Sequence, residues 1–140
     1  MVVVFDTNVL VAATLSPFGA SFQLLALLPE RRFELLVSVP VMLEYEEVLK
    51  REDMRAQSHL TLEEVDVLLD MLAAIGTPCT PFFQWRPQLS DPDDEMLLEL
   101  AVNGHANAIV TVNTRDFLPA ARTFGVEVLR PGAFLRRLRS

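Results

Sequence analysis

The chain has 140 residues, 51% of them apolar, and a formal net charge of −7. This length fits one domain, 1–140, and the apolar content excludes a disordered chain and supplies a core that needs no disulfide. The acidic balance excludes a nucleic-acid interface spread over a wholly basic surface, although a sum of charges leaves room for a local one.

The N-terminal third predicts a buried strand followed by an uncharged stretch. Val2 to Phe5 is a short β-branched run, typical of a central parallel strand. Residues 7–29 carry no charge and are long enough to span a bilayer. Ser16-Pro17 and Gly19 break this stretch into two short pieces, and no basic segment precedes it as in a signal peptide. We therefore expect no membrane segment and a cytoplasmic protein.

The rest of the chain alternates between apolar runs and helical spacing. Thr61 to Glu64 is a capping box, and Asp91-Pro92 is typical of a helix start. The expected elements are, in chain order, a helix over 21–28, a strand over 33–39, helices over 41–49 and 61–76, a loop over 77–90, a helix from 91, strands over 108–112 and 126–129, and a last helix from 131. Such alternation predicts an α/β fold with a parallel sheet covered on both sides.

Acidic residues follow the predicted strands, and ligands of such sheets gather beyond the carboxyl ends of the strands. Asp6 comes directly after the first strand, where the alternative role is a helix cap. Glu44 lies six residues past Ser38, near the same edge, with Glu47 one turn further on; an acidic, solvated helix face is its alternative. Glu46 points elsewhere and is interpreted as a surface residue.

The densest acid is the run Asp91-Pro92-Asp93-Asp94-Glu95. A helix N-terminus explains one or two of these carboxylates, because they complement the helix dipole. The others repel one another unless a cation is present, and oxygen-rich clusters bind Mg²⁺ and Mn²⁺. Asp116 follows the strand at 108–112 and could instead cap a short helix before Pro119.

The four acidic positions together predict one reaction class. The sequence offers carboxylates but no catalytic cysteine, Ser-His pair or glycine-rich loop. Such a set suits phosphodiester hydrolysis promoted by divalent cations that the carboxylates bind. His59 and His105 are isolated and are interpreted as surface or core residues. A phosphoryl-accepting aspartate, as in haloacid-dehalogenase-like phosphatases, would need an acid where Asn8 stands and a later lysine, whereas the only lysine is Lys50.

The strings around these acids resemble PIN-domain nucleases, especially the VapC-like toxins of bacterial toxin–antitoxin pairs, from Val2 to about Phe134. The run Asp6-Thr7-Asn8-Val9-Leu10 resembles the first acidic motif of that family, and Thr111 to Phe117 its fourth. The resemblance implies a three-layer α/β/α sandwich, Mg²⁺ or Mn²⁺, single-stranded RNA or tRNA as substrate, and frequent homodimers. It implies that the catalytic residues are Asp6, Glu44, Asp94 and Asp116, of which Asp6, Asp94 and Asp116 bind the metal. The supporting residues that it implies are Thr7, Asn8, Asp91, Asp93, Thr111 and Asn113.

Two assignments within this resemblance stay open. Asp93 replaces Asp94 if the helix begins one residue later, and Asn113 and Asp116 share one role if the fourth acid stands earlier, as in some relatives. We expect Arg115, beside Asp116, to contact a phosphate of the RNA. A metal-dependent ribonuclease, as the toxin of a pair with an antitoxin protein, is the leading hypothesis. A non-catalytic PIN module that binds RNA or a protein is the alternative.

Overall fold

A five-stranded parallel sheet forms the centre of the computed structural model, which describes residues 1–80 and 91–140. The strand order is β3-β2-β1-β4-β5, and every neighbouring pair is parallel. The strands are β1 (Val2–Phe5), β2 (Glu34–Val37), β3 (Thr77–Pro78), β4 (Ala108–Val110) and β5 (Glu127–Leu129). The predicted α/β class with a central parallel sheet is therefore confirmed.

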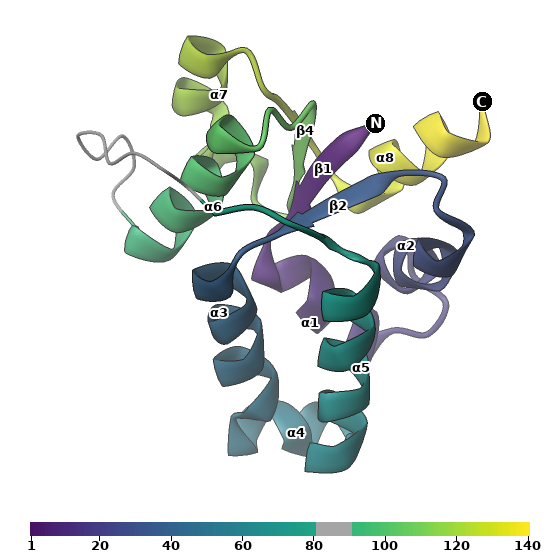
Figure 1. Ribbon diagram of the computed structural model, residues 1–140. Coiled ribbons are helices and arrows are strands. Elements are labelled where there is room, and N and C mark those ends of the chain that lie inside the picture. Colours follow the sequence, from purple (N-terminus) through teal and green to yellow (C-terminus); the bar gives the residue numbers. More distant parts are fainter. Residues whose placement is uncertain (81–90) are drawn as a thin grey trace.

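Helices cover both faces of the sheet and extend beyond one edge of it (Figure 1). They are α1 (Thr7–Leu15), α2 (Ala20–Leu27), α3 (Val39–Lys50), α4 (Glu52–Ser58), α5 (Leu62–Ile75), α6 (Pro92–Asn103), α7 (Leu118–Phe124) and α8 (Pro131–Arg139), with 3-10 turns η1 (Leu28–Glu30) and η2 (Thr114–Asp116). Figure 1 shows α3, α4 and α5 extending below the sheet, while α6 and α8 lie beside the strands.

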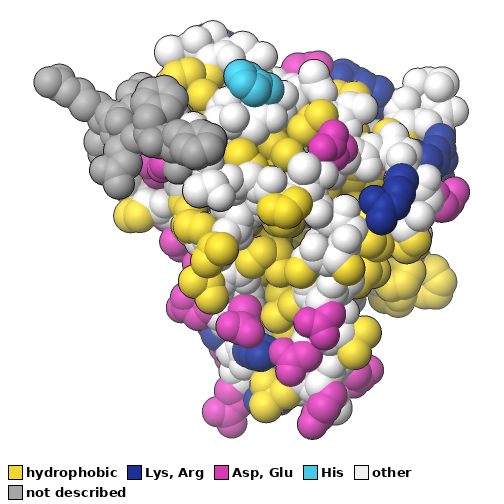
Figure 2. Space-filling view, in the orientation of Figure 1, with side chains coloured by type: hydrophobic (Ala, Val, Ile, Leu, Met, Phe, Trp, Pro, Cys, Tyr) yellow, Lys and Arg dark blue, Asp and Glu magenta, His cyan; other side chains and the backbone are white. Residues whose placement is uncertain are grey.

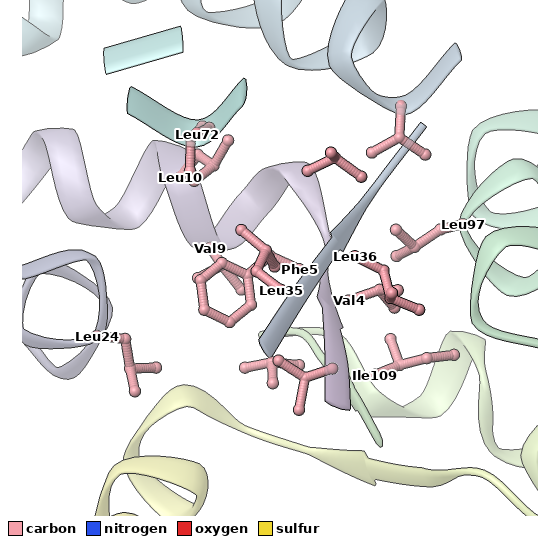
Figure 3. Packing of buried hydrophobic residues seen from close by; sticks show 14 of the residues in the cluster. Val4, Phe5, Val9, Leu10, Leu24, Leu35, Leu36, Leu72, Leu97 and Ile109 are labelled. Carbon is pink, nitrogen blue, oxygen red and sulfur yellow. The ribbon is translucent and has the colours of Figure 1, made fainter. Parts of the chain in front are cut away.

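The alternation of side chains along each strand builds two apolar layers. On one face Val4 pairs in register with Ile109, and both pack toward Leu97 of α6 (Figure 3). On the other face the ring of Phe5 lies 5.8 Å from that of Phe33, which stacks edge-on against Phe134 of α8 at 5.2 Å. Both faces of β1 are thus buried, which explains why its sequence is a continuous apolar run.

The uncharged N-terminal stretch forms two helices, as its turn residues predict. The segments Thr7–Leu15 and Ala20–Glu30 meet at 104°. Within the described ranges, no single helix is long and apolar enough to cross a membrane; the bent pair passes the same test only by combined length and composition.

Two parts of the predicted secondary structure need correction. The loop expected over 77–90 begins with a short strand, because Thr77 and Pro78 pair with Leu36 and Val37 at the edge of the sheet. An edge strand tolerates proline because one side of it needs no ladder hydrogen bond. Residues 81–90 of that loop lie outside the described residues. The strands expected over 33–39 and 108–112 are shorter than predicted. β2 ends at Val37, since α3 already begins two residues later, and β4 ends at Val110.

The strand order places a crevice between β1 and β4. From β1 the chain first builds outward through β2 and β3, and then builds β4 and β5 on the opposite side. In open α/β sheets, ligands bind beyond the carboxyl ends of the strands at this reversal. Residues that follow β1 and β4 directly therefore occupy the first place to look for a site.

Candidate active site

A hydrogen bond joins the ends of β1 and β4 across this crevice. The hydroxyl of Thr111 donates to Oδ2 of Asp6 at 2.7 Å, although the two residues are 105 positions apart. The backbone N–H of Asp6 also donates to the carbonyl of Val110 at 2.9 Å. Thr111 is fully buried, so Asp6 is held from the protein side while part of its side chain remains accessible.

Asp6 occupies the N-cap position of α1. Its side chain makes no capping hydrogen bond to the first turn of that helix. Burial raises the pKa of the Asp6 carboxyl above its usual value. The Thr111 hydroxyl and the backbone N–H groups of Asn8 and Thr7 lower this pKa again in part. The Asp6 carboxylate therefore lies near the backbone N–H groups at the start of α1 and is also held toward β4 by the Thr111 hydroxyl.

Asn8 and Asn113 complete a polar network around Thr111. The side-chain amide of Asn8 donates to the Thr111 hydroxyl oxygen at 3.3 Å, and its Oδ1 accepts from the N–H of Val112 at 3.2 Å. The backbone N–H of Asn113 donates to the same hydroxyl oxygen at 3.0 Å. Because this oxygen accepts twice, its single proton is committed to Asp6. These predicted supporting residues thus fix one carboxylate.

Among the described carboxyl groups, Asp94 has the pKa that is raised most. Asp91 caps α6 by accepting from the N–H of Asp93 at 2.9 Å, and Asp94 follows in the first turn, half-buried. Burial first, and then the charges of Asp6, Asp91, Asp116 and Asp93, raise the pKa of Asp94 to about 7. The first turn of α6 therefore brings Asp94 into the electrostatic field of Asp6 and Asp116.

Asp93 takes a different place, beside Glu44. A cavity of about 20 Å³ is lined by Asp6, Thr7, Glu44 and Asp93 together with apolar residues of α3 and α6. This volume suffices for a single water molecule. Burial, followed by the charge of Asp93, raises the pKa of Glu44 above its usual value. Asp93 thus lies beside Glu44, whereas Asp94 lies within reach of the charges of Asp6 and Asp116.

Asp116 and Arg115 lie in the turn η2, and both are exposed. Asp116 caps neither neighbouring helix, because α7 has no side-chain cap, while its charge raises the pKa of both Asp6 and Asp94. Arg115 forms no ion pair with any residue in the described ranges, so the alternative of an Arg115–Asp116 pair is not observed.

Sequence reasoning gave no role to Tyr45, which lies in the helix expected over 41–49. Its side chain is fully buried, and its hydroxyl donates to the carbonyl of Phe5 at 2.5 Å. Burial and the neighbouring charge of Asp6 raise the pKa of this hydroxyl. Tyr45 fixes α3 against the end of β1, and Glu44 precedes it on the same helix. A tyrosine among apolar core positions was the only available signal, since a buried hydroxyl needs a partner.

The donor chemistry of these residues fits a hydrated divalent cation. Carboxylate oxygens are the ligands that Mg²⁺ and Mn²⁺ prefer, and a cation would offset the like charges that, after burial, raise the pKa of Asp94. Among residues 1–80 and 91–140, no three His, Cys, Asp or Glu side chains lie close enough to hold a metal alone. Mg²⁺ usually keeps several waters and takes one or two carboxylates. The site therefore lacks a closed protein cage but offers suitable ligands.

We expect Asp94 to make the metal-free protein less stable as the pH rises. The folded chain holds the Asp94 proton up to about pH 7, whereas the unfolded chain releases it near the usual pKa of 3.8. The stabilisation that the bound proton gives the folded chain is fully present below the unfolded pKa of 3.8. It is lost as the pH rises through the folded pKa of about 7. In EDTA, the fall in Tm between about pH 5 and about pH 8 should be smaller for Asp94→Asn than for wild type. Equal falls would mean that the Asp94 pKa is ordinary.

A larger cavity, about 740 Å³, lies away from these acids, between α1, α2, α4 and α5. Its lining is mostly apolar, and His59 at its rim has no carboxylate partner among the described residues. None of the predicted site residues lines it. Its size alone therefore does not make it the site of the chemistry.

Comparison with known proteins identifies one family. The sequence profile of the PIN domain family matches residues 2–115, which is most of the chain. No curated protein matches the sequence. The matched segment includes β1, β4 and α6, which carry Asp6, Thr111 and Asp94. It ends one residue before Asp116, so α7, β5 and α8 lie beyond it.

Proposed function

We propose, from the premise that the chain belongs to the PIN domain family, that it is a metal-dependent endoribonuclease. PIN domains are generally nucleases, and they typically use divalent metal ions. The observation that carries the proposal is the hydrogen bond from Thr111 to Asp6 across the crevice, with Asp94 close enough to Asp6 and Asp116 for their charges to raise its pKa. This arrangement supports phosphodiester hydrolysis better than a purely structural role.

In this proposal each acid has a distinct task. Asp6, Asp94 and Asp116 would hold Mg²⁺ or Mn²⁺, which when bound activates a water and stabilises the departing oxygen. Thr111 holds Oδ2 of Asp6 and so orients this carboxylate at the crevice. Glu44, whose pKa is raised, faces the small cavity and is suited to accept or return a proton at its carboxylate.

The acidic charge of the chain is compatible with an RNA substrate because much of it lies away from the site. Figure 2 shows acidic side chains gathered over the lower part of the molecule, where α4 and α5 carry Glu52, Asp53 and Glu63. Phosphates beside the scissile one still need basic partners. Arg115 is exposed in the same turn as Asp116 and has the position to provide one contact.

We extend the proposal to biological role on the resemblance of the first and fourth motifs. The chain would act in the cytoplasm as a homodimeric toxin, held inactive by an antitoxin protein.

Turnover of RNA with and without metal tests the proposed function. Purified protein should cleave at least one member of a panel of single-stranded and structured RNAs in Mg²⁺ or Mn²⁺, and EDTA should abolish cleavage. The expected products are internal fragments resolved on a denaturing gel. Binding of RNA without cleavage under any metal would instead identify a non-catalytic binding module.

A further inference from the structure

A second cleft, of about 520 Å³, opens between η2 and the start of α8. Its lining combines Arg130 and Arg136 with Thr114 and with apolar side chains such as Leu118 and Val128. No acidic residue lines it. Its volume falls in the range of about 300–1,000 Å³ that is typical of small-ligand sites. The cleft therefore pairs positive charge with an apolar wall.

The cleft lies at the same edge of the sheet as the acidic residues. The N–H of Thr111, whose hydroxyl holds Asp6, donates to the carbonyl of Leu129 at 2.9 Å, and Arg130 follows Leu129 directly. Thr114, at the other side of the cleft, begins the turn that ends with Asp116. The cleft therefore adjoins the turn that carries Asp116.

The arginines of the C-terminal segment divide into two groups. Arg137 pairs with Glu127 at 2.9 Å, and Arg139 donates to the side chain of Gln23 at 2.6 Å. Arg130 and Arg136 are exposed and form no ion pair within the described ranges. The Arg136 guanidinium lies over the first turn of α8. Its Nη1 is 3.5 Å from the position that a Cβ on Gly132 would occupy. Only Arg130 and Arg136 thus offer uncompensated charge to the cleft.

We propose that this cleft binds a nucleotide of the RNA strand next to the one being cut, with Arg130 and Arg136 on its phosphate. This inference rests on the proposed ribonuclease function. A nucleotide has an anionic phosphate and a flat base with apolar faces, which match the two arginines and the wall formed by Leu118 and Val128. Residues 130–136 lie beyond the segment that matches the PIN domain family, so the subsite belongs to the C-terminal part of this chain.

The test measures how binding of a fluorescent single-stranded RNA depends on salt. All proteins carry Asp94→Asn, which slows cleavage under the proposed function, and binding is followed by anisotropy in Mg²⁺. Arg136→Gln should reduce the slope of log K against log salt by about 0.7, and Arg130→Gln with Arg136→Gln by about 1.4, the single-strand values for one and two contacts. Arg136→Lys should keep the slope because it keeps the charge.

Arg137→Gln is the matched control, since it removes the same charge from the next position of α8, where the side chain already pairs with Glu127. It should leave the slope unchanged. Equal slopes for the double variant and for the protein with both cleft arginines would overturn the subsite. The proposed function would still stand, because it is tested separately by cleavage with the unsubstituted chain. A change of oligomeric state in the double variant with an unchanged slope would also overturn the subsite, and would identify a protein contact. If the unsubstituted chain cleaves no RNA, the proposed function itself fails.

Discussion

Replacement of Asp6 or of Asp94 by asparagine is expected to lower kcat for RNA cleavage by about 10²-fold or more, the scale of losing one preorganised electrostatic group. Each change removes a negative charge from the acidic cluster without removing an apolar group from the core. An asparagine at position 6 can still accept the Thr111 hydroxyl proton through its amide oxygen, so the variant should retain the fold. Cleavage rates at saturating RNA, with circular dichroism to verify folding, measure the effect.

Glu46→Gln is the control for that experiment. Glu46 lies next to Tyr45 on α3, but its carboxylate pairs with Lys50 at 3.1 Å on the surface. A partly exposed pair of this kind contributes between about 0 and 1 kcal/mol to stability, so its loss should leave both fold and kcat nearly unchanged. Wild-type cleavage by Asp94→Asn would remove Asp94 from the catalytic set and leave Asp93 as the third acid.

The elements that could be predicted from the sequence are those with a buried stripe or a local cap. The capping box of α5 forms as expected, with Thr61 and Glu64 exchanging hydrogen bonds at 3.1 Å. In contrast, α4 has no buried residue, so no apolar periodicity marks it, and β3 has only two residues. Its pairing with β2 is a tertiary contact that no local pattern records.

The candidate site could be predicted by residue type and topology but not by orientation. The position of Asp6 after an apolar run suffices to place it at the crevice, because parallel strands share one edge. The partner of its carboxylate, Thr111, lies 105 positions away, and only the fold brings the two together. The choice between Asp93 and Asp94 stays open from the sequence because it depends on whether α6 begins one residue earlier or later. In the structure Asp93 lies beside Glu44, and Asp94 lies within reach of the charges of Asp6 and Asp116.

Mg²⁺ or Mn²⁺ is expected to stabilise the folded protein, while NaCl at equal ionic strength is expected to do so much less. Without a cation, burial raises the pKa of Asp94 most, and the charges of Asp6, Asp91 and Asp116 raise it further, to about 7. A ligand that binds only the folded state stabilises it by about 2.7 kcal/mol at 100 times its Kd. Because the cation displaces the proton of Asp94, the gain should be larger at about pH 8 than at about pH 6.

Thermal unfolding with increasing MgCl₂ or MnCl₂ measures this gain, and the variants decide where the cation binds. The rise in Tm should shrink in Asp6→Asn and Asp94→Asn, whereas Glu46→Gln should respond like wild type, because its carboxylate lies in the surface pair with Lys50. The same rise in all four proteins would mean that the cation binds elsewhere. A Tm that responds to neither divalent cation more than to sodium would contradict a metal site in the crevice, and the role of the acids would then have to be sought in binding.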